Sequence, residues 1–143
     1  MRETNWNNFK AKFSQREGTK FEELAYHLFL REFDLPSAGV FGYKDQTGIE
    51  TEPVEINGEN VGFQAKYSDN GVPTGAIKDS LTKAKSKNPD LDRVVVYTNQ
   101  EFGEGKKSKE PEAKTGVESH AKILGLAIDW RVHKNFEALL AQP

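Results

Sequence analysis

The stretch from Gly48 to Lys66, GIETEPVEINGENVGFQAK, determines the predicted centre of the fold. Asn57-Gly58 stands between two runs in which apolar and polar residues alternate, and this dipeptide favours the hairpin turns that need positive φ and suit twisted strands. An antiparallel hairpin about this turn brings Glu50 alongside Gln64 and Lys66. The sequence therefore predicts that an acid, an amide and an ammonium group lie close together.

Gln64 and Lys66 are predicted to point to the same face of the sheet, because successive strand residues alternate between faces. A face that only packs against a helix would carry apolar residues at both positions. Burying an unpaired ammonium group costs free energy or shifts its pKa. The pattern therefore indicates a chemical site, and the alternative interpretation is a cross-strand ion pair with a small effect on stability.

Gly48-Ile49-Glu50 together with Gln64-Ala65-Lys66 resembles the motif of the PD-(D/E)XK nuclease superfamily, in particular its Mrr-like restriction endonuclease branch. In that branch, Gly-Ile/Val-Asp is followed by Gln-x-Lys on the next strand. Here 14 positions separate Glu50 from Gln64 (64 − 50 = 14). The chain has Glu50 where the branch usually has Asp, and Glu52 and Glu55 are alternative candidates for this acid.

The resemblance implies a deoxyribonuclease that hydrolyses phosphodiester bonds with Mg²⁺, for which Mn²⁺ would substitute. Glu50, the side-chain oxygen of Gln64 and the backbone carbonyl of Ala65 would hold the ion, since Mg²⁺ prefers oxygen ligands. Lys66 would orient or activate the attacking water and contact the scissile phosphate. Glu22, in a Phe-Glu pair on an early helix, would add an acid, although a Glu in a first helical turn is also explained by the helix dipole.

The rest of the sequence predicts a single α/β domain over residues 1–143. The β-branched run Arg93–Tyr97 is typical of a strand buried on both faces. A helix between the hairpin and this run favours parallel pairing through a right-handed crossover. We therefore expect a mixed central sheet with an antiparallel hairpin, a parallel crossover and helices on both faces. The resemblance implies that this is the restriction-endonuclease-like fold.

The other elements are expected from apolar periodicity and from turn residues. Before the hairpin we expect a helix over 6–13, a helix from a cap at Thr19 to Phe33, a strand over 40–43 and a loop with Asp45 and Gln46 beside the site. After the hairpin we expect a helix from Thr74 to Lys87 and, beyond the β-branched run, a long loop over 98–115 that leads into a helix ending at Gly125. A strand over 126–132 and a short final helix complete the prediction.

The composition excludes several classes of protein. With 36% hydrophobic and 29% charged residues, the chain is expected to fold as a soluble domain. It has no apolar run of membrane-spanning length and no signal peptide at its polar start, so a cytoplasmic location is expected. The absence of cysteine excludes disulfides and thiolate metal sites. The three histidines lie in separate predicted elements without ligand spacing.

A net charge of −2 does not favour binding to nucleic acid, so the local distribution of charge must matter more. Lys78, Lys83, Lys106 and Lys107 are candidates to hold the phosphate backbone of DNA without reading its bases. The ordinary interpretation of such lysines is a solvated helix face.

The resemblance also implies a setting, because similar domains are effectors of anti-phage defence or restriction systems. In these, a fused sensor or NTPase region, or assembly into a homo-oligomer, activates the nuclease. Two alternative functions stay open: a noncatalytic nucleic-acid-binding or oligomerisation module of the same fold, and a nuclease acting on RNA or branched DNA.

Overall fold

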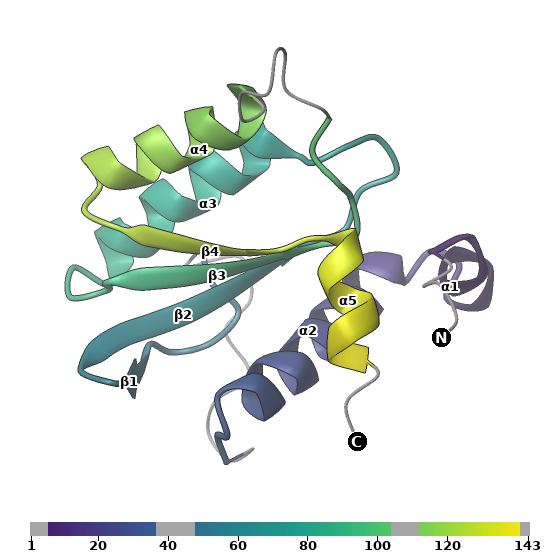
Figure 1. The fold of residues 1–143 in the computed structure, drawn as a ribbon, viewed down its shortest axis with the longest axis horizontal. Helices are drawn as coiled ribbons and strands as arrows, with labels where there is room; N and C mark the ends of the chain where they lie inside the picture. Colours follow the sequence, from purple (N-terminus) through teal and green to yellow (C-terminus); the bar gives the residue numbers. More distant parts are fainter. Residues whose placement is uncertain (1–5, 37–47, 104–111, 141–143) are drawn as a thin grey trace.

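The computed structural model describes residues 6–36, 48–103 and 112–140, which form a mixed α/β fold. A four-stranded sheet lies at its centre, in the order β1 (Val54–Ile56), β2 (Glu59–Lys66), β3 (Arg93–Thr98) and β4 (Ala127–Arg131). β1 runs antiparallel to β2, whereas β2, β3 and β4 are parallel to one another (Figure 1). The predicted hairpin and the predicted parallel crossover are both confirmed.

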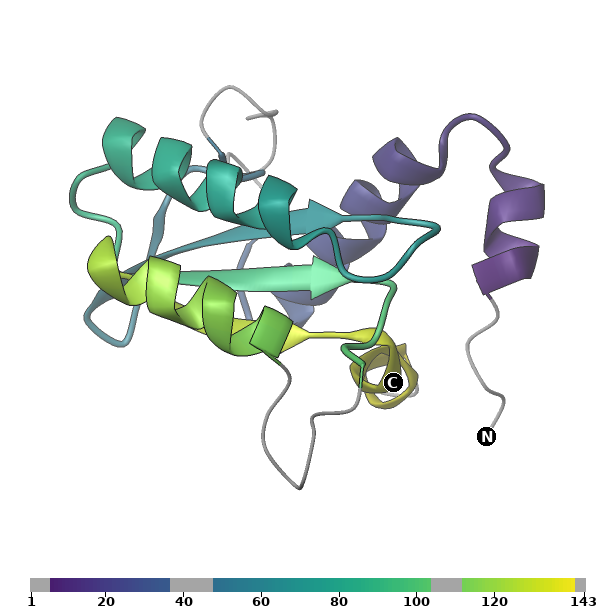
Figure 2. The same ribbon diagram turned by 90° about the horizontal axis from the view of Figure 1, so that it is seen from above.

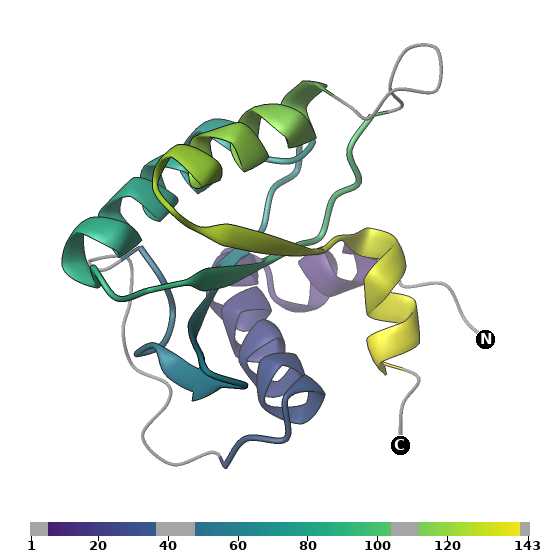
Figure 3. The same cartoon turned by 60° about the vertical axis from the view of Figure 1, so that its left-hand side comes forward.

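Helices cover both faces of this sheet, as expected. They are α1 (Trp6–Lys12), α2 (Glu17–Glu32), α3 (Thr74–Lys87), α4 (Glu112–Ile123) and α5 (His133–Leu140). α3 and α4 lie side by side over one face, and α2 and α5 lie on the other (Figures 1 and 3). In the described parts of the chain, no helix is both long and apolar enough to cross a bilayer.

Each face of the sheet has its own apolar core, and β3 contributes to both. Val95 and Tyr97 belong to the core under α2, together with Phe21, Phe29, Phe63 and Phe136. Val94 and Val96 belong to the core under α3 and α4, together with Ile77, Leu81, Leu91 and Val117. This arrangement confirms that the β-branched run forms a strand buried on both faces.

Some element boundaries differ from the sequence prediction. α2 begins at Glu17, before the predicted cap at Thr19. The chain turns at Gln15, whose φ is 66°, and α2 starts directly after Arg16, so the cap signal at Thr19 does not set the start of the helix. α4 begins at Glu112, within the segment predicted as a loop. The predicted strand 40–43 and the loop residues Asp45 and Gln46 lie outside the described residues.

An ion pair fastens the carboxyl end of α2 to β4. The guanidinium of Arg131 donates hydrogen bonds to the carboxylate of Glu32, and this contact holds the pKa of Arg131 above its ordinary value. The Tyr97 hydroxyl also reaches Glu32, at 3.5 Å. Burial, followed by the charge of Glu32, raises the pKa of Tyr97.

α1 is attached to the end of the sheet where β2 finishes. The indole Nε1 of Trp6 donates a hydrogen bond of 2.7 Å to His133 Nδ1, and Lys10 pairs with Asp69 at 3.0 Å. The ring of Phe9 lies 5.8 Å from that of Tyr67, the residue after Lys66. α1 has no buried residue of its own, so these contacts hold it beside the segment that follows β2.

Candidate active site

Gly48 fits closely against α3. Its φ is +79°, and a Cβ at this position would lie 2.1 Å from the backbone oxygen of Ser80 and 2.6 Å from the nitrogen of Ala84. Ile49, which is 1% exposed, covers Gly62 of β2, where a Cβ would lie 2.7 Å from the Ile49 Cδ1 atom. The two glycines therefore leave room for the chain to pass between α3 and β2. As a result, Glu50 lies beside β2.

Hydrogen bonds join this segment to β2. The amide of Glu50 donates to the carbonyl of Phe63 at 2.8 Å. The amide of Ala65 donates to Glu50 Oε2 at 3.0 Å, and Gln64 Nε2 donates to the carbonyl of Gly48 at 3.5 Å. The expectation that the Glu50 segment returns alongside Gln64 and Ala65 is therefore confirmed.

The site is rich in oxygen acceptors. Glu50 is 4% exposed and Gln64 is fully buried, and Gln64 Oε1 has no hydrogen-bond partner among the described residues. The carbonyl and amide of one strand residue point to the same side, so the carbonyl of Ala65 faces the edge on which Glu50 lies. A carboxylate, an amide oxygen and a carbonyl are ligands suited to a hard divalent cation.

The described residues contain no group of three or more His, Cys, Asp and Glu side chains that could hold a metal ion. Glu50, Gln64 and Ala65 together offer a carboxylate, an amide oxygen and a backbone carbonyl. This donor set fits an ion that keeps several of its waters, as Mg²⁺ does.

Lys66 is the last residue of β2 and is half-buried. Strand alternation places it on the same face as Gln64, and its register partner on β3 is Thr98. β2 and β3 run parallel, and both end on this side of the sheet (Figure 2). Lys66 therefore stands at the boundary between the sheet and the segment that follows it.

Glu52 and Glu55 lie in surroundings different from those of Glu50. Both are exposed, whereas Glu50 is buried. Neither Glu50 nor Glu52 belongs to β1, which begins only at Val54, after Pro53. Proline lacks the amide that a regular ladder needs. Glu50 is buried because α3 covers the segment that carries it.

The remaining predicted site residues are placed less closely together. Glu22 is half-buried in α2, which packs on the face of the sheet opposite to the one that Gln64 and Lys66 share. Lys78 is half-buried where α3 meets α4, near Gly116, while Lys83 is exposed on α3. Lys106 and Lys107 lie outside the described residues.

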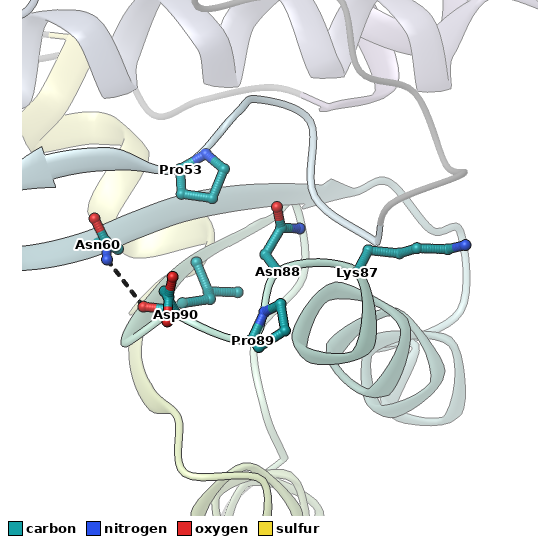
Figure 4. Close-up of a pocket in the computed structure, with 7 residues that line it drawn as sticks. Pro53, Asn60, Lys87, Asn88, Pro89 and Asp90 are labelled. Atoms are coloured by element: carbon teal, nitrogen blue, oxygen red, sulfur yellow. Dashed lines mark hydrogen bonds between the residues drawn. The ribbon is translucent and has the colours of Figure 1, made fainter.

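A polar hollow of about 340 Å³ lies elsewhere in the molecule (Figure 4). Its lining residues come from the β1 and β2 region and from the end of α3: Pro53, Asn60, Lys87, Asn88, Pro89, Asp90 and Leu91. Asn60 Nδ2 donates to the carbonyl of Asp90 at 3.0 Å across one wall. None of the predicted site residues lines this hollow, so it is separate from the acceptors around Glu50.

Sequence reasoning missed two amide side chains at the carboxyl end of β3. Asn99 is 4% exposed, and Asn99 and Gln100 both bind the backbone of Ser68. Their position directly after a buried parallel strand was the available signal, because ligand sites of α/β sheets lie at the carboxyl ends of strands.

Comparison with known proteins gives no assignment, since no family model matches the chain and no curated protein is similar to it. The fold and the site define a mixed α/β domain in which a buried acid is hydrogen-bonded to the strand that carries a buried amide and ends in a lysine.

Proposed function

We propose that this protein is a metal-dependent endonuclease of the PD-(D/E)XK type, with a restriction-endonuclease-like fold, that hydrolyses phosphodiester bonds in DNA. The observation that carries the proposal is the buried Oε1 of Gln64, which has no hydrogen-bond partner among the described residues, on the strand that also presents Lys66. A buried polar atom without a partner costs about 1–3 kcal/mol. A bound cation would satisfy this oxygen.

Glu50, Gln64 Oε1 and the carbonyl of Ala65 would hold Mg²⁺ or Mn²⁺. When bound, the ion would stabilise the charge that develops on the phosphate and favour ionisation of the attacking water. The amide of Ala65 fixes one carboxylate oxygen of Glu50 and thereby sets the orientation of the other. The Lys66 ammonium would donate hydrogen bonds to the scissile phosphate and to the attacking water.

Gln64 stands where many such sites carry a second acid, so the site has one negative charge fewer and a lower metal affinity is expected. Glu22 would contribute negative charge from α2. Lys78, Lys83, Lys106 and Lys107 would hold the phosphate backbone of DNA. The setting that we propose is an anti-phage defence or restriction system, in which oligomerisation or a fused sensor region activates the domain.

The test is a titration of Mg²⁺ and Mn²⁺ with supercoiled plasmid as substrate, alongside linear duplex, single-stranded DNA, a branched duplex and RNA. We expect nicked or linear plasmid with either metal and intact plasmid with a chelator. Binding of intact DNA at every metal concentration would favour the noncatalytic module. Cleavage confined to RNA or to the branched substrate would favour the other nuclease.

Replacing Glu50 with Gln is expected to abolish metal-dependent cleavage while changing the free energy of unfolding by less than about 1 kcal/mol, because the amide oxygen of Gln can still accept the Ala65 hydrogen bond. Glu52→Gln is the matched control, since Glu52 is exposed two residues along the chain. Cleavage rates and thermal unfolding of both variants check this prediction. Full activity in Glu50→Gln, or activity lost only in Glu52→Gln, would contradict it.

Dimerisation is expected to increase production of double-strand breaks. One site cuts one strand, and a net charge of −2 predicts weak capture of DNA by a single domain. Fusion to an inducible dimeriser raises the effective concentration of a second site to about the millimolar range. Linear product that appears only with the inducer supports the prediction, and equal rates with and without the inducer contradict it.

A further inference from the structure

The ladder between β2 and β3 is continued beyond its last pair by a side chain. Lys66 and Thr98 form the final register pair of the two strands. Beyond it, the amide of Ser68 donates to Asn99 Oδ1 at 2.9 Å, and Asn99 Nδ2 donates to the carbonyl of Ser68 at 2.9 Å. One carboxamide thus supplies both the acceptor and the donor that a neighbouring strand would offer to Ser68.

A second amide reinforces this contact. Gln100 Nε2 donates to the carbonyl of Ser68 at 2.6 Å, and the amide of Gln100 donates to Thr98 Oγ1 at 3.3 Å. The carbonyl of Gln100 in turn accepts a hydrogen bond from the amide of His133, at the start of α5. The end of β3 is therefore fixed to α5 as well as to Ser68.

These contacts place the backbone of Lys66 between two restraints. The β2 to β3 ladder holds it on the amino side, and the contact between Asn99 and Ser68 holds it two residues later. Without this contact, the backbone after Lys66 would lose its hydrogen bonds to the residue that follows β3, and opening of the strand end would become more frequent. Positioning errors of about 1 Å in a reacting group can lower a rate by about 100-fold.

We propose that Asn99, supported by Gln100, is a positioning residue that sets the location of Lys66 for the reaction. The inference rests on the proposed nuclease function, because the role of Lys66 in the reaction is part of that proposal. Asn99 acts through Ser68 and touches neither the substrate nor the metal ligands. Its loss therefore lowers the rate of the chemical step and leaves metal affinity unchanged.

The experiment uses Asn99→Ala and Asn99→Asp, with Asn60→Ala as the matched control. Asp keeps the acceptor for the Ser68 amide and loses the donor for the Ser68 carbonyl. Asn60 makes a comparable side-chain bond to the carbonyl of Asp90 at the other end of β2. Single-turnover plasmid cleavage, Mn²⁺ affinity by direct titration, thermal unfolding and amide exchange of Ser68 are measured for each protein.

We expect cleavage to fall by about 10- to 100-fold in Asn99→Ala and less in Asn99→Asp, with Mn²⁺ affinity within about twofold of the wild type. Exchange of the Ser68 amide is expected to rise at least about tenfold in Asn99→Ala only. Unchanged cleavage in Asn99→Ala would overturn the inference. Equal losses of cleavage rate in Asn60→Ala and Asn99→Ala, in proportion to their losses of thermal stability, would also overturn it.

Failure of the proposed function gives a different result. A wild-type protein that neither cleaves nucleic acid nor binds Mn²⁺ would refute the nuclease and, with it, the role of Asn99 in a reaction. In that case, Ser68 exchange that is unaffected by Asn99→Ala would also refute the ordering of the segment after Lys66.

Discussion

Lys66→Ala is expected to lower the rate of metal-dependent DNA cleavage by about 10²- to 10⁴-fold, the range attributed to a positioned group that assists proton transfer. The half-buried side chain ends β2 and belongs to neither apolar core, so its truncation leaves no core cavity. The free energy of unfolding is therefore expected to change by less than about 1 kcal/mol. Cleavage kinetics and thermal unfolding of the same preparations measure both quantities.

Lys122→Ala is the control for the loss of one positive charge. Lys122 is exposed on α4 and has no part in the proposed site. Its removal should leave the cleavage rate within about twofold, because one surface charge has little effect at physiological salt. Equal losses in the two variants would show that Lys66 contributes only general attraction for DNA. Full activity of Lys66→Ala would remove it from the site.

Gly48→Ala is expected to cause the largest loss of stability. A Cβ would lie 2.1 Å from the Ser80 oxygen, a contact with the backbone of α3 that no side-chain rotation can relieve. The φ of +79° adds about 1–2 kcal/mol for a residue with a side chain. Together these effects predict a loss of about 4 kcal/mol or more, and thermal unfolding should shift by about 10 °C or more.

Gly58→Ala separates the two contributions to this loss. Gly58 has a φ of +85° in the hairpin turn, and apart from its chain neighbours no residue has an atom within 4 Å of the position of its Cβ. This control should therefore lose only the conformational part, about 1–2 kcal/mol. An equal shift of the unfolding temperature in both variants would contradict the close fit of Gly48 against α3.

The hairpin and the strand at Arg93–Thr98 could be predicted because their signals are local: Asn57-Gly58 sets the turn, and a β-branched run marks a buried strand. The burial of Glu50 could not be predicted in this way. It depends on Gly48 meeting α3, which begins 26 positions later, at Thr74 (74 − 48 = 26). Spacing alone therefore selected Glu50 as a candidate acid but gave no indication of its burial.

The start of α2 also could not be predicted from local sequence signals alone. Thr19 has the residue type of a helix cap, yet the helix begins at Glu17, shortly after the turn at Gln15. The contact between Asn99 and Ser68 could not be predicted from the sequence either. It requires the parallel register of β2 and β3, which pairs Lys66 with Thr98 and brings the residues after them together. Sequence patterns predicted the strands but not their exact register.

The most direct measurement of the proposed site is a crystal structure of the protein soaked in Mn²⁺, with the ion located by its anomalous scattering. We expect one peak bound by a Glu50 carboxylate oxygen, by Gln64 Oε1 and by the carbonyl of Ala65, with Lys66 beside it. A peak bound by Glu52 or Glu55 with Glu50 remote, or no peak near Gln64 Oε1 at saturating Mn²⁺, would contradict it.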